Sequence, residues 1–306
     1  MLIWEDIITK IFVEIDDFCK ILDKKIKHYL IEDKTKPKRN RKSRLTESEI
    51  MTILIAGQIF KFKTFKDFYL FLKQKTNYFP NIVSYNRFVE LIKSVFIYFQ
   101  TFLLFKLLKT KNNSKVYYID STSIKVCDNK RIYSHKVFKN AKRGKTSMGW
   151  FYGFKLHYII NENGELINFY FTPGNVDDRN ESVIFSLISN LNPFSYLFGD
   201  KGYISKKLEQ NLKKRNIVLI TKKRKNQKKE NLSEYEKLLL SKRNIIESAN
   251  NILKNCYELV HSRHRNKYNA YTHWLVVLTA YIFHPNKPKI NIDNILQKKD
   301  KLLLVA

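Results

Sequence analysis

Cysteine is scarce in this sequence, and its few copies form no recognisable motif. Cys19, Cys127 and Cys256 are widely spaced and odd in number. Because no Cys-x-x-Cys pair occurs, the sequence supports neither a zinc ribbon nor a disulfide framework. The N-terminus also lacks a basic segment followed by an apolar one, so a secretory signal peptide is not expected. These features favour a protein of the reducing cytosol.

Long apolar runs and a nucleotide-binding loop are missing as well. The two longest apolar runs, residues 94–105 and 274–283, are well short of the ~20 residues that a membrane span needs. Both are predicted to be buried helices. No GxxxxGK[ST] pattern occurs, so no ATPase step is indicated. A soluble cytoplasmic protein with no membrane partner is therefore expected.

Acidic residues are few. The 306 residues include 28 Asp plus Glu against 57 Lys plus Arg, which gives a formal net charge of +29. The basic excess is spread along the chain, and an excess of this size is typical of proteins that bind nucleic acid or anionic membranes. A lysine-rich, AT-biased genome is an alternative source of part of the lysine content.

Residues 1–110 have the apolar spacing of helices and are predicted to form a helical DNA-binding region. A basic linker interrupts them at residues 33–45. Within this linker, Arg39 and Arg41 are candidate DNA contacts, because they lie among several other basic residues near Pro37.

Two helix starts in this region are marked by capping residues. Thr46, with Glu49 three residues later, predicts a capping box. Another helix is expected to begin near Ser84 and to reach about residue 108. Its polar start, which includes Arg87 as a candidate DNA contact, is typical of a helix-turn-helix reader. An ordinary helical bundle is the alternative.

From residue 111 to 285 the pattern changes to short apolar strands alternating with helices, followed by a polar tail at 286–306. The order predicts an α/β fold with a mixed five-stranded sheet flanked by helices. The Asn163-Gly164 pair predicts a type I′ hairpin turn. The expected strands are KVYYID, GFKLHYII, ELINFYF, SYLFGD and NIVLIT, and the expected helices cover residues 178–190, 204–215, 233–256 and 270–283.

Three carboxylates stand where this fold would bring them together. Asp120 and Asp200 each end a predicted strand, and Glu247 lies in a predicted helix that could cross the same sheet edge. Two divalent cations about 4 Å apart can activate a nucleophile and stabilise a leaving oxygen in phosphoryl transfer. We expect two Mg²⁺ or Mn²⁺ ions, with Asp120 bridging both and each of the other acids completing one.

Basic residues flank the third acid. Arg243, Glu247 and Lys254 fall on one helix face at 3.6 residues per turn. Beside a metal site, Arg243 and Lys254 would contact phosphates. The alternative is an exposed Arg–Glu pair that adds a few tenths of a kcal/mol to helix stability.

Other polar residues leave alternatives open. Asp177 and Asp178 could replace Asp200 as a ligand, or could cap the helix that follows. Asp128 lies in a predicted loop and carries little weight. The VHSRHR segment, with His261, Arg263, His264 and Arg265, could bind phosphates or form a basic turn.

A basic predicted loop precedes two aromatic residues. Lys142, Arg143 and Lys145 could lie along DNA. Trp150 and Phe151 could stack on an unpaired base, or they could pack in the core.

Five ordered blocks of the sequence resemble bacterial insertion-sequence transposases of the DDE class, and most of all the insertion-sequence family nine-eight-two. The resemblance spans essentially the whole chain. It implies an RNase H-like catalytic core with Asp120, Asp200 and Glu247 as the metal-binding triad, and it selects Asp200 over Asp177 and Asp178. The blocks are IDSTSIKVC, RGKTSMGWFYGFKLHYIINENGE, FTPGNVDDR, LFGDKGYISKKL and IIESANNILKN.

The same resemblance implies recognition of terminal inverted repeats and cut-and-join transposition. The partner would be double-stranded DNA, at the transposon ends and at the target, with a homo-oligomer assembled on it. Related transposases carry a Tyr three residues before the Arg of the Arg-x3-Glu-x6-Lys signature; here that position is Leu240. A stand-alone nuclease of the same fold and a catalytically inactive DNA-binding relic are the alternatives.

Overall fold

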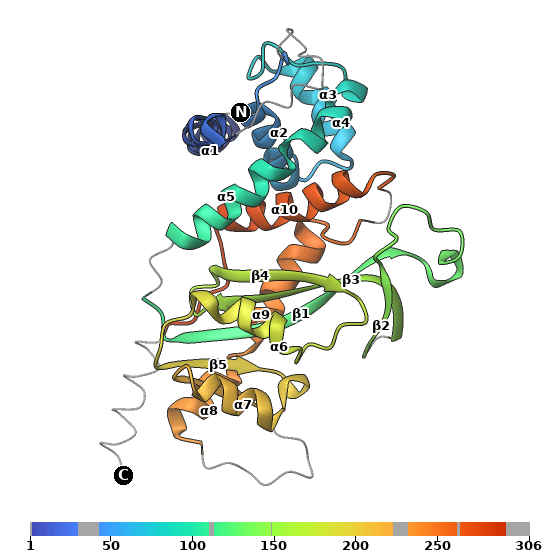
Figure 1. Cartoon of the computed structure of the whole chain (residues 1–306). Coiled ribbons are helices and arrows are strands. Elements are labelled where there is room, and N and C mark those ends of the chain that lie inside the picture. Colours follow the sequence, from blue (N-terminus) through green and yellow to red (C-terminus); the bar gives the residue numbers. More distant parts are fainter. Residues whose placement is uncertain are drawn as a thin grey trace. The chain divides into compact units, whose positions relative to one another are not determined.

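The structure is a computed structural model, and the described residues form two compact units (Figure 1). Of the basic linker 33–45, residues 33–42 lie outside this set, and so do Arg39 and Arg41. Most of the tail, residues 292–306, also lies outside it. The described residues are 2–29, 43–109, 113–147, 149–222, 232–261 and 264–291.

The first unit is helical, as the sequence predicts. Its α10 comes from the far end of the chain and packs against α2, although the sequence places that helix in the domain 111–285. Fully buried aromatic side chains such as Phe68, Phe99 and Phe102 form its core. Its elements are α1 (Leu2–Tyr29), α2 (Glu47–Ile59), α3 (Phe65–Lys75), α4 (Tyr85–Leu91), the 3-10 helix η1 (Ile92–Val95), α5 (Phe96–Lys109) and α10 (Lys267–Phe283).

The predicted starts of α2 and α4 are confirmed. Thr46 and Glu49 form a reciprocal capping box, and the Ser84 side chain accepts a hydrogen bond from the Arg87 backbone N–H. The connection between α3 and α4, residues 76–84, is longer than the turn of about three to four residues typical of a helix-turn-helix. The local structure of these helices is closer to the bundle alternative.

One helical stretch of the described residues, Tyr85–Lys109, is long and apolar enough to cross a membrane by length and composition alone, with a mean hydropathy of 1.6. The apolar run 94–105 itself remains short, and the stretch is longer because α4, η1 and α5 follow one another without a break. Phe88, Phe99 and Phe102 are buried in the helical unit. Packing within the unit thus accounts for part of this apolar character.

The second unit contains a six-stranded mixed sheet in the order β2-β3-β1-β5-β6, with β4 paired to β3 as well (Figure 1). β3 runs antiparallel to β1, β2 and β4, whereas β5 runs parallel to β1 and β6. The strands are β1 (Val116–Cys127), β2 (Lys142–Thr146), β3 (Gly149–Asn161), β4 (Leu166–Pro173), β5 (Ser195–Gly199) and β6 (Ile217–Thr221).

This sheet confirms the expected fold class, with one strand more than predicted. The arrangement is RNase H-like: it has three antiparallel strands, two parallel strands and flanking helices, and a helical region precedes it. The additional strand is β2, which the sequence predicts as a loop. The segment has little β-propensity, and its pairing with the first half of β3 is a tertiary contact.

The β3–β4 hairpin is confirmed, but its turn differs from the prediction. The Gly164 N–H donates to the Asn161 carbonyl at 3.0 Å, and the Asn161 N–H donates to the Glu165 carbonyl at 3.1 Å. Gly164 has a φ of +69°, whereas Asn163 is not among the described non-glycine residues with positive φ. A type I′ turn needs positive φ at both central residues, so that prediction is wrong.

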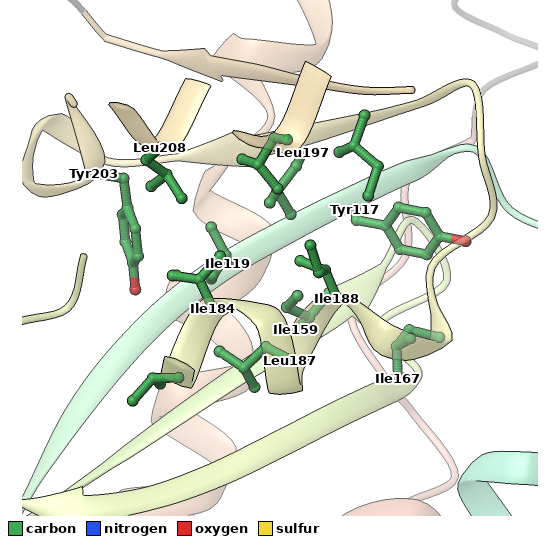
Figure 2. Close-up of a cluster of buried hydrophobic side chains, with 13 residues drawn as sticks. Tyr117, Ile119, Ile159, Ile167, Ile184, Leu187, Ile188, Leu197, Tyr203 and Leu208 are labelled. Carbon is green, nitrogen blue, oxygen red and sulfur yellow. The ribbon is translucent and has the colours of Figure 1, made fainter. Parts of the chain in front are cut away.

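Helices cover both faces of the sheet. On one face, α6 (Glu181–Leu187), the 3-10 helix η3 (Ile188–Asn190) and α7 (Lys206–Lys213) bury a cluster that includes Tyr117 and Ile119 (Figure 2). On the other face, the Tyr118 hydroxyl donates to the carbonyl of Leu239 at 3.2 Å, and the Tyr158 hydroxyl donates to that of Ile246 at 3.2 Å. These bonds attach α8 (Glu234–Ser241) and α9 (Asn244–Asn251) to the sheet.

The long helix predicted over residues 233–256 is therefore three segments. α8 ends at Ser241, α9 begins at Asn244, and a π-helical segment, Ile252–Cys256, follows. No Gly or Pro marks the break at residues 242–243. The separate attachment of α8 and α9 to β1 and β3 is a contact that the local sequence does not reveal.

Candidate active site

Asp120 and Asp200 come from neighbouring parallel strands. β1 and β5 pair from Val116↔Tyr196 to Tyr118↔Phe198. Continuing this register by two residues places Asp120 beside Asp200, just beyond the end of the ladder. β1 continues to Cys127 alongside β3, so the prediction that Asp120 ends its strand is wrong. The expectation that β1 and β5 are neighbouring strands is confirmed.

Side-chain alternation directs Asp120 to the face covered by α8 and α9. Asp120 lies two residues after Tyr118, whose hydroxyl contacts α8, so both side chains share a face. The Asp120 Oδ1 accepts a hydrogen bond from the Ser121 N–H at 2.8 Å, and its Oδ2 accepts one from the Asn250 Nδ2 of α9 at 2.9 Å.

The surroundings of Asp120 favour its neutral form. Burial raises the pKa of the Asp120 carboxyl to about 6, and the negative charges of Asp200 and Asp178 act in the same direction. The Ser121 N–H and the Arg243 guanidinium oppose this shift. A buried carboxyl group whose pKa is raised further by the charges of other acids is typical of a functional site.

Tyr203 is buried in the same group of acids. It lies in the 3-10 helix η4 (Lys201–Tyr203), which the Asp200 side chain caps by accepting from the Gly202 N–H at 2.7 Å. Burial raises the pKa of Tyr203 well above its usual value, and the charges of Asp120, Asp178 and Asp200 raise it further. Its hydroxyl accordingly stays protonated next to these carboxylates.

Glu247 does not join the two aspartates in this structure. Its carboxylate is ion-paired with Arg243, one turn earlier, and its side chain is 59% exposed. Among the described residues, no three His, Cys, Asp or Glu side chains lie close enough to hold a metal ion together. The Arg243 side chain is only 15% exposed, and its charge reaches Asp120.

Lys254 is close enough to Asp120 for the charge of that carboxylate to affect its pKa. Burial lowers the pKa of its ammonium group, and the charge of Asp120 partly opposes the shift. Lys254 belongs to the π-helical segment Ile252–Cys256, and π-helical turns occur frequently at functional sites.

The neighbouring acids have other partners. The prediction that Asp177 or Asp178 caps the following helix is wrong, because Asn180 is the N-cap and accepts from two backbone N–H groups of α6. Asp178 is ion-paired with Lys155 at 2.9 Å. Arg179 binds the Asp177 carboxylate and lowers its pKa to about 2.

Asp128 is not part of the site. It is ion-paired with Lys125 at 2.8 Å, and its side chain is 74% exposed.

The basic residues 142, 143 and 145 lie on a strand, not in a loop. β2 pairs with β3 so that Arg143 is opposite Tyr152 and Lys145 is opposite Trp150. Lys142, Arg143 and Lys145 are exposed. Gly144 faces inward, where a Cβ would lie 2.1 Å from the Gly174 carbonyl oxygen, so only glycine fits there.

The two aromatic residues that follow have different surroundings. Phe151 is buried, whereas Trp150 is 61% exposed with the Lys145 ammonium 5.7 Å from its ring centroid. Phe151 therefore packs in the core. Trp150 alone is exposed enough to stack on an unpaired base.

The remaining candidates lie elsewhere. Arg87 is ion-paired with Glu90 at 2.6 Å on the surface of α4. Of the VHSRHR segment, Arg263 lies outside the described residues, Arg265 is exposed, and His261 and His264 are half-buried.

The sequence interpretation missed Asn250 and Tyr203. Asn250 follows Glu247 by three residues, so helical spacing alone places both on one face of α9. Its Oδ1 is inaccessible to solvent and has no hydrogen-bond partner among the described residues. Tyr203 follows Asp200 by three residues, but nothing in the local pattern marks it as a neighbour of the acids.

Two carboxylates and an amide group form the oxygen-rich centre of this site. Asp120, Asp200 and Asn250 offer the hard oxygen donors that Mg²⁺ and Mn²⁺ prefer. The unpaired Asn250 oxygen in a negatively charged setting fits a cation better than it fits a sealed apolar core.

Comparisons with known proteins agree with this picture. A family model described as the transposase DDE domain matches residues 110–267, more than half of the chain. None of the curated proteins matches.

Solved structures give weaker likenesses. A piggyBac transposase synaptic complex with hairpin DNA is 11% identical, with 91% of this chain and 72% of that chain covered and a TM-score of 0.49. A Mos1 transposase paired-end complex with the left transposon end is 10% identical, with 87% and 86% covered and a TM-score of 0.24.

Proposed function

Because the chain belongs to the DDE transposase family, we propose that it binds the inverted-repeat ends of an insertion sequence and catalyses metal-dependent strand cleavage and strand transfer. The observations that support the proposal are the parallel pairing of β1 with β5 and the hydrogen bond from Asn250 of α9 to Asp120. The transposase DDE domain in general is a metal-dependent polynucleotidyl transferase domain.

Asp120, Asp200 and Glu247 are the proposed metal ligands. A pair of Mg²⁺ or Mn²⁺ ions, when bound, would activate the attacking oxygen and stabilise the leaving one. The chain's own contribution is to orient the Asp120 carboxylate through Ser121 and Asn250. It also places Glu247 one helical turn from Arg243.

Binding of DNA could break the ion pair between Arg243 and Glu247. In this structure Arg243 and Glu247 neutralise one another. A phosphate group can compete for the guanidinium, because arginine binds phosphate through charge-assisted hydrogen bonds. We propose that DNA draws Arg243 away and so frees Glu247 to join Asp120 and Asp200.

The basic strand β2 supplies a second DNA contact. Lys142, Arg143 and Lys145 are exposed, and the Lys145 ammonium lies 5.7 Å from the ring centroid of the exposed Trp150. Cations beside an aromatic face are typical of nucleic-acid surfaces. Further proposed contacts are Lys254, Arg87, Arg39 and Arg41, the last two outside the described residues.

We also propose that the chain belongs to a particular insertion-sequence family. Membership in insertion-sequence family nine-eight-two rests on the five sequence blocks, and a homo-oligomer on DNA and a cytoplasmic site of action follow from it. Matched inverted repeats just outside the reading frame would support this assignment, and sequencing the flanking DNA tests for them.

The triad is tested by replacing each carboxylate with the amide of the same size and shape. Asp120→Asn, Asp200→Asn and Glu247→Gln should each reduce cleavage and strand transfer to background while DNA binding stays within about threefold of wild type. The assay uses labelled transposon-end DNA with Mg²⁺, and binding is measured by gel shift. Asp128→Asn, which changes an exposed acid, is the matched control and should stay active. Cleavage by any of the three variants removes that residue from the triad.

Two alternatives are separated by the same assay. Pre-cut ends that carry a free 3′-hydroxyl should be joined to target DNA by a transposase, and a stand-alone nuclease would leave them unjoined. Metal-dependent cutting of any DNA excludes an inactive relic.

A further inference from the structure

One side chain of α9 contacts the candidate metal site without being a carboxylate. Arg243, Glu247 and Asn250 follow one another at spacings of four and three residues, which keeps them on one face of a helix. Asn250 is the member of this row that touches Asp120, through a hydrogen bond of 2.9 Å from its Nδ2.

The other end of the Asn250 amide is unsatisfied. Its Oδ1 is inaccessible to solvent and accepts no hydrogen bond in the part of the chain that the structure describes. A buried acceptor without a donor is normally avoided, since it loses its interaction with water. The group that contacts this amide is the Asp120 carboxyl, which the charge of Asp200 also reaches, and an ionised carboxylate cannot donate a hydrogen bond.

A divalent cation bound by the two aspartates would give the Asn250 oxygen the partner that it lacks. Asparagine carbonyl oxygens are ordinary ligands of hard cations alongside carboxylates. The third predicted acid, Glu247, is ion-paired with Arg243 in this conformation. A ligand set formed without DNA would therefore contain Asp120, Asp200 and an oxygen from Asn250.

We propose that Asn250 is a metal-binding residue whose amide oxygen ligates a divalent cation held by Asp120, and whose Nδ2 orients Asp120 before the cation arrives. This inference rests on the proposed function, because that function supplies the cation. It adds a ligand that the acidic triad does not include, and it gives the DNA-free protein a way to hold one cation before Glu247 is released.

The test is Mn²⁺ binding to the full-length protein without DNA, measured by the loss of the free-ion signal in electron paramagnetic resonance. Asn250→Leu, which has a similar volume and no ligand atom, should weaken Mn²⁺ binding by about tenfold or more. Asn250→Asp keeps a ligand oxygen but removes the N–H donor, and it should bind Mn²⁺ at least as tightly as wild type. Asn251→Leu, at the exposed neighbouring position, should leave the affinity unchanged.

Two results would overturn the inference. One is wild-type Mn²⁺ affinity in a folded Asn250→Leu variant. The other is a loss of binding in a folded Asn250→Asp variant, because the residue would then act only through its N–H. The second result decides the question even if the leucine variant fails to fold, and circular dichroism reports folding.

The failure of this inference is distinguishable from failure of the proposed function. Asp120→Asn should abolish Mn²⁺ binding under either outcome for Asn250. If Asp120→Asn binds Mn²⁺ as wild type does, the proposed metal site itself is wrong. If Asn250→Leu binds Mn²⁺ normally while Asp120→Asn does not, the acidic site stands and Asn250 has no part in it.

Discussion

Burial dominates the chemistry of Asp120. The carboxyl has a hydrogen bond from Ser121 and another from Asn250, yet burial still raises its pKa to about 6. Ionised Asp120 is therefore a cost to the folded protein that a bound cation would offset. This is a common compromise at active sites, where stability is given up for function.

The Asp120 pKa predicts a pH-dependent gain in stability for Asp120→Asn in the absence of metal. Since the folded-state pKa is raised above the unfolded value, wild-type stability falls as pH rises from about 4 through about 6. The variant has no such loss. Its free energy of unfolding should exceed that of wild type by on the order of 3 kcal/mol at pH 8, and the gain should shrink toward pH 4.

Denaturant unfolding in EDTA at pH 4, 6 and 8 measures this difference. Asp128→Asn is the control, because Lys125 lowers the pKa of that exposed carboxyl and no gain is expected at pH 8. A difference between Asp120→Asn and wild type that does not change with pH would contradict the assigned pKa.

At the scale of the element, α2 shows how local chemistry positions a core helix. Residues 50–56 are all buried, so α2 has no polar face that could fix its start. The start is fixed instead by the box in which the Glu49 N–H donates to the Thr46 Oγ1 at 3.2 Å and the Thr46 N–H donates to the Glu49 Oε2 at 2.7 Å.

Thr46→Ala should therefore lower the free energy of unfolding of the protein by about 1 kcal/mol, since it removes one half of the box. Thr46→Ser keeps the hydroxyl acceptor and should cost only a few tenths of a kcal/mol. Urea titration followed by circular dichroism compares the two. Equal stabilities of the alanine and serine variants would show that the cap is not formed in solution.

β2 shows the opposite case, in which local chemistry is misleading. The segment KRGKT has the composition of a loop, yet it forms a strand because β3 offers it a partner edge. Gly144 permits the close approach to Gly174 and Phe151 that this pairing requires. The strand holds Arg143 and Lys145 opposite two aromatic residues, where a loop would leave them free to move.

For the whole molecule, the net charge of +29 predicts strong salt dependence of DNA binding. Each phosphate contact releases counterions, so the affinity falls steeply as salt rises. The exposed cations of β2 are part of the proposed DNA surface, and their share of this dependence can be measured.

Replacing Lys142, Arg143 and Lys145 by alanine should weaken DNA binding and reduce the slope of log affinity against log salt by about 2 to 3, at ~0.9 per lost phosphate contact. Fluorescence anisotropy with transposon-end DNA between low and moderate salt measures the slope. Alanine at Lys206, Lys213 and Lys214, exposed residues of the α7 region, is the charge-matched control. A slope that falls equally in both triple variants would argue against a specific role for β2.

Much of this architecture follows from the sequence. The helix starts at Thr46 and Ser84, the β3–β4 hairpin, and the apolar strands before Asp120 and Asp200 are local signals, since capping and alternation depend on neighbours within a few residues. Such signals are weaker where local preference and tertiary contact disagree, as at β2, at the break between α8 and α9, and at the hairpin turn.

The sequence by itself determined the basic charge, the order of strands and helices, and the residue types available for chemistry. Only the tertiary structure decided that β1 and β5 are parallel neighbours, that Asn250 touches Asp120, and that Arg243 holds Glu247 away from the two aspartates. The physical reason is distance along the chain: Asp120 and Asn250 are 130 residues apart. A hydrogen bond between them exists only once the sheet has formed and α9 has packed on it.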